Sequence, residues 1–172
     1  MFSDVNNVLK LYKELHPEDE IVTKEDIVVK TLETVFINSL YNDLGFLVNK
    51  GSSSKLIMLV EAQSTWNKNM TLRMLFYLSE TYRHYLRNTG QNVHLTTKVT
   101  LPVPELYIVY TGQKKDVPNE ISFKEDFDIS NSAIDLRVKI LSKVDTTIYG
   151  QYIGLCRYLT NSVCCMETVL SV

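Results

Sequence analysis

Cysteine, histidine, proline and glycine are all scarce in this 172-residue sequence, which contains three, three, four and six of them. The three cysteines lie near the end of the chain and lack the spacing to one another or to histidine that a zinc site needs. No histidine lies close to them in the sequence, so a catalytic cysteine is disfavoured. Their odd number and position favour reduced thiols of a cytosolic protein. The cysteines are Cys156, Cys164 and Cys165.

Long hydrophobic runs and a large excess of one charge are also missing. No apolar stretch approaches the length of a membrane span, and the N-terminus shows no signal-peptide pattern. We therefore expect a cytoplasmic protein with no membrane partner. The net charge of −2 gives no global basic field, which counts against DNA binding, although a local basic patch could still provide it.

The hydrophobic share of 45% over 172 residues suits one globular domain with a sizeable core. Hydrophobic periodicity and turn residues predict helices and strands in an order typical of an α/β or α+β domain with a mixed sheet. The predicted elements are a helix over 4–15, an acidic solvated loop at 18–20, two strands within 30–48 separated near 38–42, a hairpin loop at 49–54, a strand at 55–63, a helix from about 70 to 86, a strand at 105–110, a turn-rich stretch to about 131, a strand at 133–141 and a final helix from about 151.

The strand at 55–63 begins as a buried apolar run and ends on Glu61-Ala62-Gln63. Because side chains alternate across a strand, Glu61 and Gln63 are expected to project on the same face. The hairpin loop at 49–54 would let the preceding strand pair antiparallel with this one. That pairing would bring Asp43 near the level of Glu61 and Gln63.

Two carboxylates at one edge of an apolar sheet are costly unless something compensates them. Together with a neutral oxygen donor they are suited to Mg²⁺ or Mn²⁺ rather than to zinc. Such a cation supports phosphodiester hydrolysis. The pattern by itself leaves a simpler alternative open: Asp43 as a bend residue and Glu61 as the solvated end of a strand.

Four motifs extend the argument, because they occur in order along the chain. They are NDLGFLV, KLIMLVEAQST, NMTLRMLFYLSETY and LPVPELYIVYTG. The segment from about Lys30 to Gly112, and more weakly to about Tyr158, resembles the PD-(D/E)XK nuclease family transposases, also called recombination-promoting nucleases. This resemblance implies a restriction-endonuclease-like core, with a central mixed sheet flanked by helices. It also implies magnesium-dependent DNA cleavage associated with mobile elements and recombination.

Carried over residue by residue, the resemblance gives Asp43 and Glu61 the roles of the two metal-binding carboxylates. Gln63 stands where most relatives in the wider superfamily have lysine, and it would orient the attacking water or a phosphate oxygen. The Ala62 carbonyl would be a further metal ligand. Arg73 matches the arginine on the helix after the motif strand, which favours a role near the scissile phosphate or in holding Glu61.

A DNA-binding surface is expected on that helix and at its entrance. Five cations, one anion and two histidines occur between residues 64 and 100, as a phosphate-backbone binder requires. A solvated helix face is the alternative for its polar residues. Trp66 could pack on a base or cap the helix entrance, and packing is favoured. The predicted DNA-binding residues are Lys68, Arg73, Tyr77, Arg83 and Arg87.

The expected organisation is an N-terminal helix and acidic loop at 1–29, a nuclease-like domain at 30–158, and an atypical tail at 159–172. Members of the family commonly run further, so a second hypothesis is a catalytically inactive short form that binds DNA or a full-length relative and regulates it. A homodimer or a heteromer with such a relative would be its assembly. The intact Asp43, Glu61 and Gln63 favour the nuclease.

Overall fold

The computed structural model describes residues 4–19, 21–31, 44–50, 53–62 and 66–169. Within these ranges, side chains are described except at 29–31, 44, 53, 59–62 and 161–169. Asp43 and Gln63 therefore lie outside the described residues, and Glu61 and Ala62 are described by their backbone alone. The segment 159–172 is likewise described only in part.

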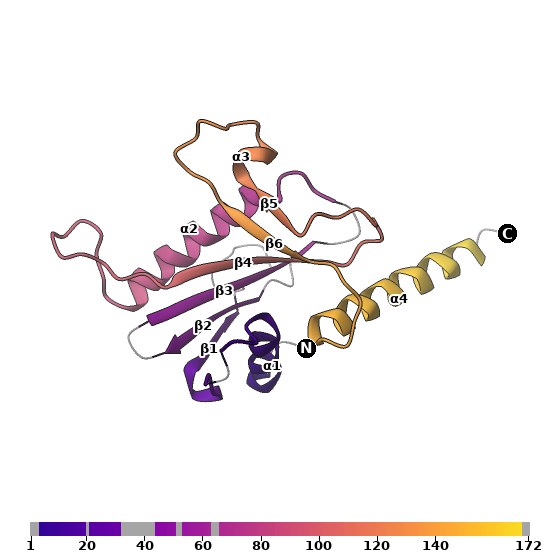
Figure 1. Cartoon of the computed structure of the whole chain (residues 1–172), viewed down its shortest axis with the longest axis horizontal. Helices are drawn as coiled ribbons and strands as arrows, with labels where there is room; N and C mark the ends of the chain where they lie inside the picture. The colour runs from indigo at the N-terminus through magenta and orange to yellow at the C-terminus, as the bar shows by residue number, and fades with distance from the viewer. Residues whose placement is uncertain (1–3, 20, 32–43, 51–52, 63–65, 170–172) are drawn as a thin grey trace.

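Figure 1 shows the helices and strands in their order along the chain. The elements are α1 (Val5–Leu15), the 3-10 helix η1 (Lys24–Asp26), β1 (Ile27–Thr31), β2 (Leu44–Lys50), β3 (Ser53–Ala62), α2 (Met70–Asn88), β4 (Val103–Tyr110), β5 (Glu120–Ser122), α3 (Phe123–Asp126), β6 (Arg137–Leu141) and α4 (Ile148–Val169).

The six strands of the described part of the chain form one mixed sheet in the order β1-β2-β3-β4-β6-β5. The β1–β2, β2–β3 and β5–β6 pairs are antiparallel, whereas β3–β4 and β4–β6 are parallel. The hairpin between β2 and β3 pairs Lys50 with Ser53 and carries this register to Leu44 opposite Leu59. The predicted antiparallel hairpin is thereby confirmed.

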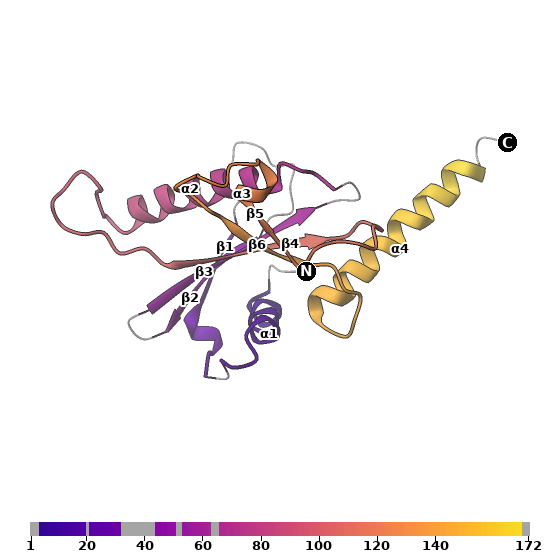
Figure 2. The same cartoon turned by 45° about the horizontal axis from the view of Figure 1, so that its top comes forward.

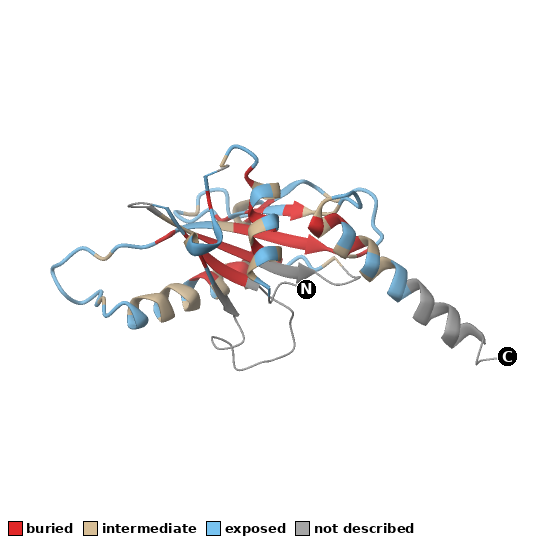
Figure 3. Cartoon of the chain, turned by 90° about the horizontal axis from the view of Figure 1, so that it is seen from below, coloured by how far each residue is buried: buried red, intermediate tan, exposed pale blue. Residues whose placement is uncertain are grey.

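Helices cover both faces of the sheet, with α1 on one side and α2 on the other (Figure 2). Alternate residues of β3 serve the two layers: Ile57 is buried in the core on the α1 side, and Met58 in the core on the α2 side. The buried residues in Figure 3 accordingly lie along the strands and on the helix faces that meet them. The fold is a mixed α/β domain with a mixed sheet flanked by helices, as the sequence predicts.

The helix boundaries follow from local chemistry. α1 begins where the Asp4 carboxylate accepts a hydrogen bond of 2.9 Å from the Asn6 amide, and it ends at His16, directly before Pro17. Residues spaced by three or four positions put Val8, Leu11 and Tyr12 on its buried face. α2 buries Met70, Thr71, Met74 and Leu78 by the same spacing.

Several boundaries differ from the sequence expectation. β1 already begins at Ile27, and α4 begins at Ile148. β6 is confined to Arg137–Leu141, so the expected strand from 133 begins too early. The stretch expected to be rich in turns contains β5 and α3, because Ile121 pairs with Val138 and is buried against the sheet. Isolated three-residue strands carry too little periodicity to be recognised before their partner is known.

The acidic stretch at 18–20 is solvated only in part: Glu18 is exposed, as expected, whereas Asp19 is not. Asp19 accepts a hydrogen bond of 2.8 Å from the Tyr12 hydroxyl and forms an ion pair with Lys50, and its side chain is only 13% exposed. Two partners on different elements therefore hold this carboxylate against the fold.

Candidate functional site

The predicted site lies where β3 ends in the middle of the sheet. The backbone of Glu61 pairs with Val109 and that of Ala62 with Tyr110, at the carboxyl ends of the parallel strands β3 and β4. Loops that follow the carboxyl ends of parallel strands are where open α/β sheets commonly bind ligands. The position of Glu61 on the backbone is thus compatible with the predicted site.

The side chains of the proposed carboxylate constellation lie outside the described part of the chain. Asp43 and Gln63 lie outside the described residues, and the side chains of Glu61 and Ala62 are not described. Over the described part of the chain, no three His, Cys, Asp or Glu residues are grouped as a metal site would require. The last described pair of the β2–β3 hairpin is Leu44 and Leu59, one residue after Asp43 and two residues before Glu61.

Arg73 lies on the first turns of α2 and is half-buried. Its Nη2 donates a hydrogen bond of 3.0 Å to the Tyr77 hydroxyl, and its Nη1 lies 3.4 Å from the Met70 sulfur. The guanidinium carbon is also 5.7 Å from the centre of the Tyr77 ring. One helical turn therefore holds Arg73 through both the hydroxyl and the ring of Tyr77, as expected for residues at i and i+4.

Trp66 packs at the entrance to α2, as the sequence predicts. Its ring meets the Tyr110 ring edge-on, with centroids 5.6 Å apart, and Lys114 Nζ lies 5.8 Å from its centre. Tyr110 is fully buried and is the backbone partner of Ala62. The aromatic pair thus braces the C-terminal ends of β3 and β4 at the predicted site.

The predicted DNA-binding residues all belong to α2 or its entrance, and the structure separates them into two groups. Arg73 and Tyr77 form the half-buried pair just described, whereas Lys68, Arg83 and Arg87 are exposed. Of the exposed group, Arg83 lies 3.5 Å from the Glu80 carboxylate, which offsets part of its charge.

A described surface hollow of about 430 Å³ lies elsewhere, beside α3, and none of the predicted site residues lines it.

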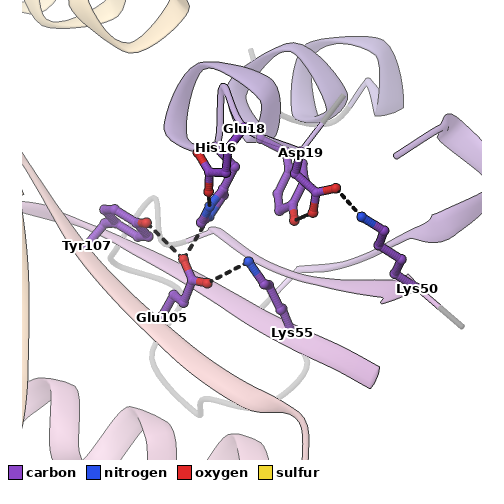
Figure 4. A network of polar contacts seen from close by, with 8 residues as sticks. His16, Glu18, Asp19, Lys50, Lys55, Glu105 and Tyr107 are labelled. Atoms are coloured by element: carbon purple, nitrogen blue, oxygen red, sulfur yellow. Dashed lines mark hydrogen bonds and ion pairs between the residues drawn. The ribbon is translucent and has the colours of Figure 1, made fainter. Parts of the chain in front are cut away.

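Sequence reasoning missed a polar network at the other end of β3 and β4 (Figure 4). His16 lies between two carboxylates: Nδ1 is 3.2 Å from Glu18, and Nε2 is 2.7 Å from Glu105. The Nε2 contact is close enough for an ion pair but lacks hydrogen-bond geometry. Glu105 also accepts a hydrogen bond of 3.0 Å from the Tyr107 hydroxyl and lies 3.1 Å from Lys55 Nζ.

The pKa values of several side chains in this network, and in the adjoining Tyr12–Asp19–Lys50 group, are shifted. Burial, reinforced by the neighbouring carboxylates, raises the pKa of Tyr12 and Tyr107. The hydrogen bond from Lys50, with that from Tyr12, lowers the pKa of Asp19. These side chains come from α1, the following loop, β2, β3 and β4, so no local motif could have revealed them. They fasten the N-terminal segment to the sheet at the end far from Glu61.

Comparison with protein families supplies the identity of the domain. Residues 14–151 match the family model described as "Putative transposase, YhgA-like". The chain belongs to this family. The match covers most of the sequence, including β3, α2 and β4. Comparison with the curated proteins and with the solved structures gave no match.

Among the described residues, no helix is both long enough and apolar enough to cross a membrane.

Proposed function

We propose that the protein is a metal-dependent DNA endonuclease of the PD-(D/E)XK type, with a restriction-endonuclease-like core, acting in the movement or recombination of mobile elements. The observation that carries this proposal is the family match. It runs over residues 14–151 and includes every residue of the predicted site. The mixed sheet with helices on both faces is compatible with the proposed core.

The donor set fits Mg²⁺, with Mn²⁺ as an alternative, because it consists of oxygen atoms alone. In the proposal, the carboxylates of Asp43 and Glu61 and the carbonyl oxygen of Ala62 hold the cation. When bound, the cation would lower the pKa of a water molecule and stabilise the charge that develops on the phosphate.

Protein side chains would orient the attacking water and bind the phosphates. Gln63 would orient the attacking water or a phosphate oxygen by hydrogen bonds, because its amide carries no charge. Arg73 would contact the scissile phosphate, and the Tyr77 hydroxyl would fix the direction of its guanidinium. The exposed Lys68, Arg83 and Arg87 would bind phosphates further along the DNA.

The test is nicking of supercoiled plasmid by the purified protein with Mg²⁺, with Mn²⁺ or with EDTA. We expect cation-dependent nicking that is lost in Asp43→Asn and Glu61→Gln. The matched control is Glu25→Gln, which changes an exposed carboxylate on η1, beside α1. Equal nicking by all variants would reject the site. A folded protein that binds DNA without cleaving it would instead favour the regulatory alternative.

A further inference from the structure

A loop that projects from the end of α2 is exposed but held by hydrogen bonds at its base and at its tip. We call residues 91–100 the arm. In Figure 1 it extends beyond α2 at the left, and Figure 2 places it on the α2 side of the sheet. Figure 3 shows it almost wholly exposed. It links α2 to β4 and is long for such a connection, which is typical of functional loops.

The direction of the arm is set where α2 ends. The Gln91 amide donates a hydrogen bond of 2.9 Å to the Leu86 carbonyl, and the Gly90 amide one of 3.2 Å to the Arg87 carbonyl. This pair is the Schellman arrangement, and it places Gly90 at φ +66°. The helix end therefore turns the chain outward in a defined direction.

The base of the arm is then closed by hydrogen bonds across it. The Gln91 side chain accepts from the Thr100 amide at 2.6 Å and donates to the Thr100 carbonyl at 3.3 Å. The Tyr82 hydroxyl donates a bond of 2.8 Å to the Pro102 carbonyl, which ties the returning strand to α2. The loop is thus pinned at both ends before it reaches β4.

The tip is ordered by a turn of its own, yet it displays apolar side chains to solvent. Asn92 accepts hydrogen bonds from the His94 amide at 2.9 Å, through its side chain, and from the Leu95 amide at 3.3 Å, through its carbonyl. Val93 is 60% exposed and Leu95 64% exposed. An ordered tip that buries neither side chain contributes little to the stability of the fold. The tip is therefore better explained as a contact surface.

The charge around the arm favours an anionic partner. Between Glu80 and Glu105 the sequence contains no acidic residue, whereas Arg83, Arg87 and Lys98 are all exposed there. This run of one sign contrasts with a protein of net charge −2. A projecting element with cations and exposed aliphatic side chains suits a DNA duplex, since lysine binds phosphates and aliphatic side chains enter the minor groove.

We infer that the arm is a second duplex-DNA contact, with Lys98 on the phosphate backbone and Val93 and Leu95 in the groove. This inference rests on the proposed function for its substrate. α2 has 19 residues and so spans roughly 28 Å, the length of about eight base pairs. The duplex would run along α2, from Arg73 near the predicted catalytic edge to the arm at the far end.

The test is binding of a duplex of about 20 base pairs, long enough to span α2, measured at several salt concentrations. Lys98→Ala is expected to weaken binding and to reduce the slope of log K against log salt by about one. The double variant Val93→Ser/Leu95→Ser is expected to weaken binding by roughly tenfold with the slope unchanged. Lys24→Ala, an exposed lysine on η1, is the matched control and should leave both quantities unchanged.

Each outcome separates the two proposals. If the wild type and all arm variants bind the duplex equally strongly, the arm contact is overturned and the nuclease proposal is unaffected. The exposed tip would then suit a protein partner. Loss of binding in the arm variants of a protein that nicks no DNA supports the arm contact and rejects the nuclease. A wild-type protein that binds no duplex overturns both. Since the substituted side chains are exposed, circular dichroism should show native folding in every variant.

Discussion

The Nε2 atom of His16 lies 2.7 Å from Oε2 of Glu105, and this contact joins the end of α1 to the start of β4. His16 is 6% exposed, and its other ring nitrogen faces Glu18. The end of α1 is therefore held against β4 by a polar contact as well as by hydrophobic packing. Removing the imidazole would leave the Glu105 carboxylate without one of its closest partners.

We expect His16→Gln to lower the free energy of unfolding by about 1–3 kcal/mol, because glutamine cannot place polar atoms at both positions of the ring nitrogens and would leave Glu105 without this partner. Urea denaturation followed by tryptophan fluorescence measures the change. His94→Gln, at the exposed tip of the arm, is the control and should be neutral. Equal stability of the two variants would show that the buried contact is dispensable.

The ion pair of Asp19 with Lys50 predicts a dependence on acid. Since the folded-state pKa of Asp19 is lowered, its contribution to stability is present above the ordinary aspartate pKa of about 4 and is lost as the pH falls below it. Asp19→Asn should be less stable than the wild type at neutral pH, and the difference should shrink in acid. Thermal unfolding across this pH range measures it. A difference that stays constant into strong acid would contradict the assignment.

Tyr12 and Tyr107 predict a dependence on alkali with the opposite sign. Burial raises their pKa values in the folded state, so the neutral phenols favour folding up to the ordinary tyrosine pKa of about 10, and stability falls as the pH rises beyond it. In Tyr12→Phe and in Tyr107→Phe, the free energy of unfolding should fall less steeply with pH near and above pH 10 than in the wild type. Phenolate absorbance offers an independent check: in the folded protein these two rings should be among the last to ionise.

The contact between Arg73 and Tyr77 predicts an effect on catalysis if the proposed nuclease is correct. Tyr77→Phe keeps the ring beneath the guanidinium but removes its hydrogen-bond acceptor. We expect a fall of roughly fivefold in the single-turnover nicking rate, equivalent to about 1 kcal/mol, with little change in DNA affinity. Tyr85→Phe on the same helix is the control. A variant that loses affinity and keeps its rate would place Tyr77 in DNA binding alone.

Gly90 predicts a cost at the root of the arm. A Cβ atom there would meet no neighbour within 4 Å, so any effect of substitution comes from the positive φ rather than from a clash. Gly90→Ala should destabilise the fold by about 1 kcal/mol, and Gly90→Asn by less, because asparagine tolerates the left-handed region. Urea denaturation ranks the two. The reverse order would show that the helix end does not depend on this conformation.

The central elements could be predicted because their local patterns agree with their final environment. The apolar stripe of α2 and the apolar runs of β3 and β4 are strong signals, and the observed boundaries of these elements lie within about two residues of the predicted ones. The scarcity of glycine and proline inside them removes competing interpretations. The favoured packing of Trp66 agrees with its edge-on contact with Tyr110.

The remaining features depend on contacts between distant segments, which periodicity does not report. β5 exists because Ile121 meets Val138, and Asp19 is held because Lys50 reaches it from the end of β2. The arm cannot be predicted from the sequence for the same reason. Gln91 and Thr100 have no local pattern that reveals the hydrogen bond between them across its base. The metal-binding carboxylates remain a prediction from the residues and the family.

The pairing of Lys50 with Ser53 sets more than the shape of one hairpin. All pairs of β2 and β3 follow in register from this pair. A register shift of one residue between the two strands would therefore move the side chains of one strand to the opposite face of the sheet. The residues that approach the predicted catalytic edge would then exchange neighbours and faces. The register at one end of the sheet thus constrains the proposed chemistry at the other.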